Sequence, residues 1–139
     1  MEDFFIMKKQ QLATLILRVV FGLMFLIHGI AKFQGGISNT VGYFEFLGLP
    51  GSLAYAIAII ELVGGALLVV GLGTQVISGL FAVIMLGAIF SAKLSFGLLG
   101  DGVSAGYELE LVYLAIGIYF VLVNPINLSL DEKLAQKNK

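Results

Sequence analysis

Ionisable side chains interrupt the most apolar segments of this sequence, and their types suit the binding and protonation of a small molecule. They are Arg18, His28, Lys32, Glu61 and Glu108. Imidazole and carboxyl groups can donate and accept protons at a bound molecule, and ammonium groups can donate hydrogen bonds to a carbonyl. Whether these groups act together depends on the elements that carry them.

The segment 12–33 is an apolar stretch with a cationic edge. At about 100° per residue, Arg18, Phe25 and Lys32 project on nearly the same side of a helix, and His28 lies within a quarter turn of them. The segment is as long as a helix must be to cross a bilayer, about 20 residues. A charge that faces lipid at mid-bilayer costs about 2.5 to 3.5 kcal/mol on insertion scales. We therefore expect the cationic edge to face other helices that supply anions.

Glu61 is the charged residue near the centre of the apolar segment 52–71. With about 1.5 Å of rise per residue, it falls level with Met24 if the two segments are antiparallel helices. Its carboxylate could then reach Arg18 on one side or His28 on the other. We predict that Glu61 pairs with one of them, and that Arg18 and Glu61 belong to a buried ion network.

Glu108 and Glu110 open the apolar segment 107–123. Two residues apart on a helix, they point to different sides, so only one of them is expected to face the interior. Glu108 falls level with Lys32 at the outer mouth of the bundle. We predict that Glu108 is the inward-facing carboxylate.

Groups from three segments thus reach similar depths and predict a ligand site in the outer half of the bundle. Its predicted residues are Phe25, His28, Lys32, Glu61 and Glu108. A few polar groups gathered within apolar walls are typical of a small-molecule site. The alternative is a closed salt-bridge network that fixes helix register and holds no ligand. We expect no metal site, because the single histidine has no partner at a metal-ligand spacing.

Composition sets the class of the protein. Hydrophobic residues make up 59% of the chain and charged residues 12%, against about 25% charged in an average soluble domain. The 139 residues leave room for one domain of about four spans, so the predicted fold is all-α: a polytopic membrane protein with a four-helix transmembrane bundle. The predicted spans are 12–33, 52–71, 76–92 and 107–123. The net charge of -1 gives no reason to expect nucleic acid as a partner.

The connections differ in length and character. The segment 34–51 is rich in Tyr and Phe, which suits the membrane interface. The segment 76–92 carries no ionisable residue, so it is expected to be mainly structural, and a glycine-rich connection follows it at 93–106. The tail 131–139 is expected to be solvated.

Lysines set the expected orientation. Both ends of the chain are rich in lysine, whereas the long connections carry only Lys32 and Lys93 at their edges. With an even number of spans, the positive-inside rule predicts that both termini are cytoplasmic. The expected location is the inner, cytoplasmic membrane of the cell.

The order of the motifs along the chain resembles the DoxX family of small bacterial four-helix membrane proteins. The resemblance covers residues 12–131 and rests on an ordered succession: Arg18-x-x-x-Gly22-x-x-Phe25-x-x-His28-Gly29-x-x-Lys32-Phe33, Phe46 to Gly48 with Pro50, Glu61-x-x-Gly64-Gly65, Gly71-x-x-Thr74, Gly106-Tyr107-Glu108-Leu109 and Leu128-Ser129-Leu130-Asp131. The chain departs from the family at Gln75, where arginine is frequent, and at Asn124-Pro125-Ile126, in place of a more glycine-rich helix exit.

The resemblance implies a link with membrane-associated redox systems, including quinone-related and oxidative-stress functions. Its implied partners are the lipid bilayer and membrane redox proteins. A quinone-like ligand would suit the predicted site, because its carbonyl can accept from His28 or Lys32 and its ring can lie on Phe25. A small carrier or exporter of an organic molecule, or a purely structural membrane partner, is the alternative.

A self-contained redox enzyme is not favoured. The chain has no cysteine for an iron–sulfur cluster and a single histidine, too few for bis-histidine haem within one chain. An accessory or ligand-binding role is therefore expected.

Overall fold

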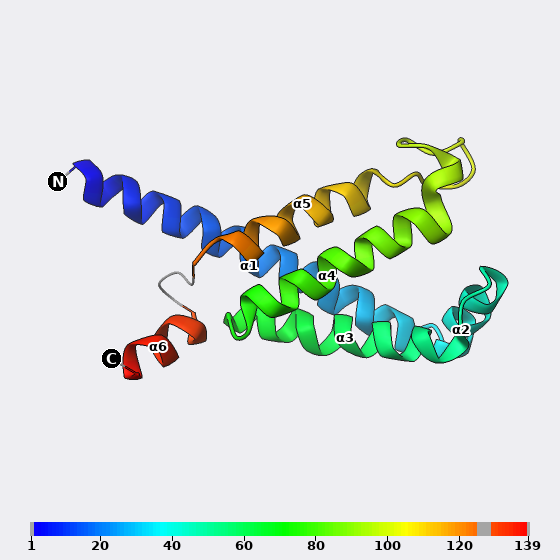
Figure 1. The fold of residues 1–139 in the computed structure, drawn as a ribbon, viewed down its shortest axis with the longest axis horizontal. Helices are drawn as coiled ribbons and strands as arrows, with labels where there is room; N and C mark the ends of the chain where they lie inside the picture. Colours follow the sequence, from blue (N-terminus) through cyan, green and yellow to red (C-terminus); the bar gives the residue numbers. More distant parts are fainter. Residues whose placement is uncertain (1, 125–128, 139) are drawn as a thin grey trace.

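The chain folds into an elongated bundle of helices, described here by a computed structural model for residues 2–124 and 129–138 (Figure 1). No strand occurs in these two ranges. The helices are α1 (Glu2–Gln34), α2 (Ile37–Phe46), α3 (Gly51–Val70), α4 (Thr74–Ala88), α5 (Glu108–Leu122) and α6 (Leu130–Lys137). A π-helical turn, Ile89–Lys93, and a 3₁₀ turn, Leu94–Phe96, extend α4. The predicted all-α class is confirmed.

Helices long and apolar enough to cross a membrane account for much of the described chain. They are Lys8–Gln34, Gly51–Val70 and Thr74–Phe96. Helix α5 is equally apolar along most of its length, but it has 15 residues. At 1.5 Å per residue it is about 22 Å long, shorter than a hydrocarbon core of about 30 Å. The fourth crossing, and with it the count of four spans, stays a prediction.

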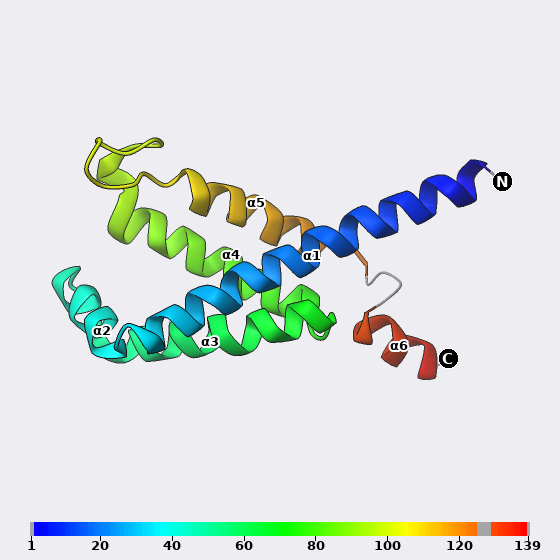
Figure 2. The same ribbon diagram turned by 180° about the vertical axis from the view of Figure 1, so that it is seen from behind.

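The helices pack as two antiparallel pairs, α1 with α3 and α4 with α5 (Figure 2). Small residues let the first pair approach closely. A Cβ atom on Gly65 would lie 2.4 Å from the backbone nitrogen of Leu26, so any larger residue there would push α1 and α3 apart. Lipid tails are as apolar as the helix side chains, so close van der Waals packing of this kind holds helices together in a membrane.

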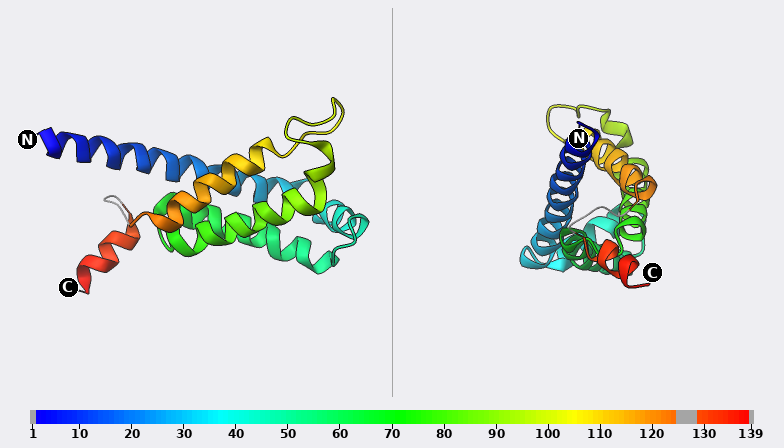
Figure 3. Two further views of the ribbon diagram at one scale, coloured as in Figure 1. Left: turned by 45° about the horizontal axis from the view of Figure 1, so that its top comes forward. Right: turned by 90° about the vertical axis from the view of Figure 1, so that its left-hand side faces the viewer.

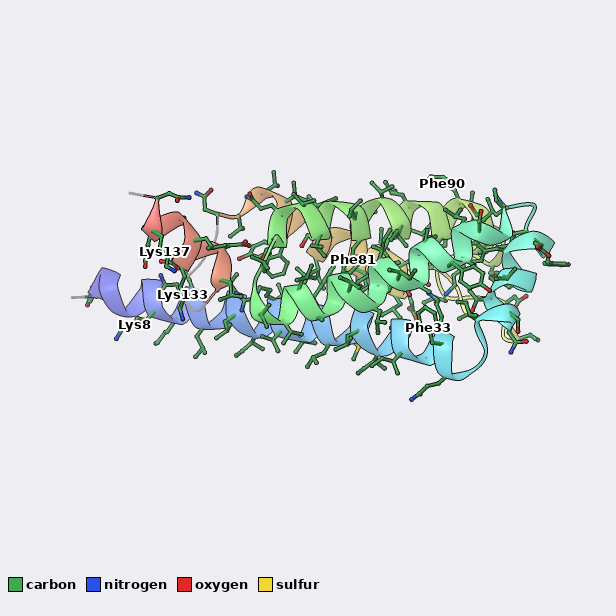
Figure 4. All side chains as sticks on the ribbon, turned by 90° about the horizontal axis from the view of Figure 1, so that it is seen from below. Lys8, Phe33, Phe81, Phe90, Lys133 and Lys137 are labelled. Carbon is green, nitrogen blue, oxygen red and sulfur yellow. The ribbon has the colours of Figure 1, made fainter. Side chains whose placement is uncertain are left out.

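Aromatic rings fill the core where the two pairs meet. Phe25 stacks on Phe81 with ring centroids 3.8 Å apart and 12° between the planes. Phe21 and Tyr113 contact Phe25, with ring centroids 5.0 Å and 5.3 Å from its centroid. Figure 4 shows Phe81 at mid-length of the bundle. The core therefore ties one helix pair to the other near the middle of the molecule.

The two ends of the bundle differ in what covers them (Figure 3). We call one the terminal end, because both chain termini, the α3–α4 turn and α6 lie there. The other is the loop end, with α2 and the connection 97–107. Helix α2 packs on α3 and carries exposed Tyr43 and Phe46, consistent with the expected interfacial character of the segment 34–51.

The tail is anchored at Asp131, the first residue of the segment 131–139 that was expected to be solvated, whereas residues 133–138 are exposed. Asp131 accepts hydrogen bonds from the backbone N–H groups of Gly73 (2.8 Å) and Thr74 (2.9 Å) at the start of α4, and its own N–H donates to the carbonyl of Gly71 (2.9 Å). A carboxylate at a helix N-terminus satisfies otherwise unpaired amides and interacts well with the helix dipole. Pro125, Ile126 and Leu128, which belong to the motifs above, lie outside the described residues.

Candidate functional site

A cleft of about 790 Å³ lies between the two helix pairs. Its walls are mostly aliphatic and aromatic side chains of α1, α2, α3, α4 and α5. The predicted residues Phe25, His28, Lys32 and Glu61 all line it. Glu108 does not line it, whereas Lys93 and Glu110 do. The cleft therefore gathers ionisable groups from both helix pairs.

Lys32 of α1 and Glu61 of α3 form an ion pair in the wall of the cleft. Glu61 is 4% exposed, so it depends on a partner for its charge. The predicted pairing of Glu61 with Arg18 or His28 is wrong. Helix depth alone did not account for the four-carbon stem of lysine, which lets an ammonium group reach well away from its own backbone position.

Lys93 and Glu110 form a second ion pair, on the α4/α5 side of the cleft. Glu110 is buried and Glu108 is exposed, so the prediction that Glu108 faces inward is wrong. The two glutamates do point to different sides, but the helix is rotated so that the second faces the interior. The π-helical turn Ile89–Lys93 brings Lys93 to this place at the end of α4. Such turns are rare and occur often at functional sites.

His28 lines the cleft, and one of its ring nitrogens is bonded to the backbone of its own helix. Its Nδ1 lies 2.6 Å from the carbonyl oxygen of Met24. A carbonyl only accepts, so Nδ1 carries a proton, whereas Nε2 accepts in the neutral ring and donates in the charged ring. Neither ion pair includes His28. His28 is thus held by its own helix and not by a glutamate.

Phe25 forms the floor of the cleft and is 2% exposed. Its ring face is stacked on Phe81, which makes it part of the packed core. The expected role of Phe25 as a platform for a ligand ring is therefore restricted to its edge. Tyr113, 9% exposed, borders the cleft beside it.

Arg18 belongs to the terminal end, away from the cleft. Its guanidinium Nε donates to the carbonyl oxygen of Leu68 (3.0 Å), and the Asp131 carboxylate acts on it electrostatically. Leu68 is seven residues along α3 from Glu61, about 10 Å. Arg18 and Glu61 are both buried, but the predicted ion network between them is wrong. The cavity beside Arg18 measures about 10 Å³, room for at most about one water molecule.

The family follows from the comparison with known proteins. The DoxX family model matches residues 13–94. This chain belongs to the DoxX family. It is a membrane protein, and the predicted resemblance is confirmed. No solved structure matches the chain.

Curated DoxX relatives match over most of their length. A Bacillus subtilis (strain 168) protein named "Putative oxidoreductase CatD" is 39% identical over 124 residues, which are 89% of this chain and 88% of that protein. A Haemophilus influenzae protein described as "Uncharacterized protein" is 36% identical over 122 residues, 87% of this chain and 90% of its own. A Mycobacterium tuberculosis protein described as an "uncharacterized membrane protein" is 30% identical over 135 residues, covering 90% and 83%.

The DoxX match covers one side of the cleft more fully than the other. It includes His28, Lys32 and Glu61, and it extends to Lys93. Glu110, the partner of Lys93, lies beyond it. Sequence reasoning missed Lys93 because it stands at the end of an otherwise uncharged segment. The available signal was its place: Lys32 also stands at the end of an apolar helix, and each lysine is followed by a glutamate on the next long helix.

Proposed function

We propose that this DoxX protein is a ligand-binding component of a membrane redox system and that its cleft holds a quinone-like molecule. The observation that carries the proposal is the cleft itself. Its volume of about 790 Å³ falls within the range of about 300 to 1,000 Å³ that is usual for small-molecule sites. Apolar walls with a few convergent polar groups complete the resemblance to such a site.

The chemistry of the walls suits a flat, oxygenated ring. Aliphatic side chains such as Leu53, Ile57 and Ile84 provide apolar surface for the ring. Lys32 and Lys93 each hold three N–H donors, and an ion pair with one glutamate leaves donors for a ligand oxygen. The hydrophobic tail of a quinone partitions into the hydrocarbon core of the bilayer, where the helices also lie. The word oxidoreductase in the name of the Bacillus subtilis relative supports a redox context.

We propose a component of a redox system and not a self-contained redox enzyme, because electron transfer needs a redox-active group such as an iron–sulfur cluster or haem. The sequence has no cysteine for a cluster and one histidine. Protons, by contrast, can be exchanged at the ligand by His28 and by the two glutamates in the cleft wall. Membrane redox proteins are accordingly the proposed partners.

A thermal melt in detergent tests the proposal. A ligand that binds only the folded protein at 100 times its dissociation constant stabilises it by about 2.7 kcal/mol. Short-chain ubiquinone or menaquinone analogues are expected to raise Tm of the wild type, and to raise it less in His28→Ala. Glu108→Gln, an exposed position outside the cleft, is the matched control and should respond like the wild type. An unchanged Tm with every analogue would remove the quinone proposal and favour a carrier or structural role.

We further propose that the chain lies in the inner, cytoplasmic membrane with both termini in the cytoplasm, so that the cleft opens toward the outer side. Lys8, Lys133 and Lys137 lie at the same end of the bundle (Figure 4). The positive-inside rule assigns such an end to the cytoplasm. Reporter fusions after residue 139 and within residues 34–51 test this, and a tail found outside the cell would overturn it.

A further inference from the structure

We propose that helix α6 is a surface anchor that binds the acidic phospholipids of the leaflet at the terminal end of the bundle. The proposal is independent of what the cleft holds and of which side of the membrane the terminal end faces. It concerns Leu130–Lys137, a helix whose leucines and lysines are all exposed on the protein. Short helices that combine exposed apolar side chains with lysines are typical of segments that lie on an anionic membrane surface.

The fold holds the start of α6 at the edge of the membrane. Asp131 accepts hydrogen bonds from the amides of Gly73 and Thr74. Thr74 is also the first residue of Thr74–Phe96, a helix long and apolar enough to cross the bilayer. Since such a helix begins near the edge of the hydrocarbon core, the carboxylate bound to its first amides lies there too. In the right-hand view of Figure 3, α6 runs from this point toward the rim of the bundle end, where the C-terminus lies. Lipid headgroups beside the bundle are therefore within its reach.

Local contacts form α6 but leave its leucines uncovered. The side chain of Ser129 caps the helix by accepting from the N–H of Glu132 (3.1 Å). Leu130 and Leu134 remain 40% and 51% exposed. Isolated helices shorter than about 12 residues are marginal in water, so a helix of this length gains from burying its apolar side chains. Acyl chains at the membrane surface supply the burial that the bundle does not give.

The side chains of α6 are sorted into two halves. At about 100° per residue, an arc of about 100° carries two leucines and two lysines: Leu130, Leu134, Lys133 and Lys137. The acids lie outside this arc, where Asp131 binds the amides of α4 and Glu132 accepts from Gln136 (3.2 Å). The stem of a lysine can lie along apolar surface while its ammonium group reaches a polar partner. Leucines in the acyl layer and lysines on phosphate oxygens therefore fit one face of α6 at the same time.

The start of α1 adds positive charge at the same level. Lys8 is the first residue of another candidate span, and Lys8 and Lys9 are both exposed. Figure 4 shows Lys8 at the same end of the bundle as Lys133 and Lys137. A lysine near an anionic membrane surface increases the binding constant by about fivefold. These lysines give the terminal end a preference for acidic over zwitterionic lipids.

A single fluorescent label on the tail of the full chain tests the proposal. The sequence contains no cysteine, so Asn138→Cys provides one labelling position directly after α6. The protein is placed in nanodiscs of phosphatidylcholine alone or of equal parts phosphatidylcholine and phosphatidylglycerol, and lipids with a nitroxide near the headgroup quench a label that contacts the surface. We expect the equilibrium constant for tail contact to be at least about tenfold higher in the mixed nanodiscs. It should fall in 1 M salt, where the Debye length is about 3 Å.

Variants of α6 locate the effect. The double variant Lys133→Gln/Lys137→Gln is expected to lower the constant in mixed nanodiscs by about 25-fold, and Leu134→Ser by about fivefold. Glu132→Gln, on the other half of α6, is the matched control and should not lower it.

Equal quenching of the wild type in the two lipid compositions would overturn the proposal, and so would a double lysine variant that keeps the wild-type preference. A tail that contacts neither surface would overturn it as well and would leave an acidic protein surface as the partner of these lysines. The comparison of the two lipid compositions uses the native α6 sequence, so it decides the matter even if a variant does not fold.

Discussion

The two ends of the bundle use charged side chains in different ways. At the terminal end, charged side chains bind the backbone: Arg18 donates to the carbonyl of Leu68, and Asp131 accepts from the amides of Gly73 and Thr74. These contacts join α1, α3, α4 and the tail, and they leave a cavity of only about 10 Å³. The terminal end is closed by them.

At the loop end, charged side chains bind each other across neighbouring helices. Lys32 pairs with Glu61 and Lys93 with Glu110, and both pairs border the cleft of about 790 Å³. A lysine keeps further donors and a carboxylate keeps further acceptors after one contact. The difference teaches that the partner of a buried charge, more than the charge itself, separates a structural contact from a candidate site.

The largest effect is expected at the loop end, from Lys32→Ala. It leaves Glu61, 4% exposed, without its cation. Removing one partner of a buried pair costs about 3 to 5 kcal/mol. Glu61→Ala should cost less, because the Lys32 side chain is 26% exposed and its ammonium group can turn into the cleft. Unfolding by denaturant in detergent measures both.

The control for this comparison is Glu108→Ala, at an exposed position that does not line the cleft. Its effect should fall within about 0.5 kcal/mol, as for most surface changes. Equal losses for Lys32→Ala and Glu61→Ala would show that the two partners depend on the pair to the same degree and would contradict the asymmetry.

A smaller effect is expected at the terminal end, from Gly71→Ala. Gly71 has φ +77°, and a Cβ atom there would lie 2.6 Å from Cβ of Ser129 and 2.9 Å from Cζ of Arg18. The left-handed conformation costs about 1 to 2 kcal/mol, and overpacking adds about 1 to 3 kcal/mol. We expect a total loss of about 2 to 5 kcal/mol in the same unfolding experiment.

Gly73→Ala is the matched control for that change. Gly73 has φ +66°, but the nearest atom to an added Cβ would be Cγ1 of Ile77 at 3.7 Å, an ordinary contact. The substitution therefore introduces the backbone strain without the clash. If Gly71→Ala and Gly73→Ala cost the same, the tail and Arg18 do not close the terminal end as tightly as the structure indicates.

The sequence predicted helices where α1, α3, α4 and α5 lie, and much of one cleft wall, but it did not predict the shorter helices α2 and α6. The helical period placed Phe25, His28 and Lys32 on one side of α1, and all of them border the cleft together with Glu61. These residues were predictable because a charge within an apolar span must face the protein interior. Their action on a ligand stays a prediction.

The other wall and the closed end were not predictable from local pattern. The choice between Glu108 and Glu110 depends on the rotation of α5, and the place of Lys93 depends on a π-helical turn that no residue pattern announces. Arg18 donates to two backbone carbonyls, a kind of partner that every residue carries. Asp131 reaches amides 57 and 58 residues earlier in the chain. In each case the outcome depends on the backbone or on residues distant in the chain, and a local sequence pattern shows neither.

The smallest effect should come from Asp101, which does at the loop end, within its own loop, what Asp131 does between distant segments. Asp101 Oδ1 accepts from the N–H groups of Ser104 (2.6 Å) and Val103 (3.0 Å), and these bonds hold the pKa of the carboxyl below its usual range. A lowered folded-state pKa means that the stabilisation is present above the unfolded value of about 3.9 and is lost as the pH falls through the lower folded value. The amide chemical shift of Ser104 should thus stay constant from about pH 7 to pH 5 and change only below about pH 4. Asp101→Asn should abolish that step and lower Tm at neutral pH by much less than Gly71→Ala does, because the partners of Asp101 lie only two and three residues away. The binding of quinone analogues in the cleft should stay unchanged. A fall in Tm as large as that of Gly71→Ala would show that the loop end, too, is held by an aspartate, and the contrast between the two ends would be lost.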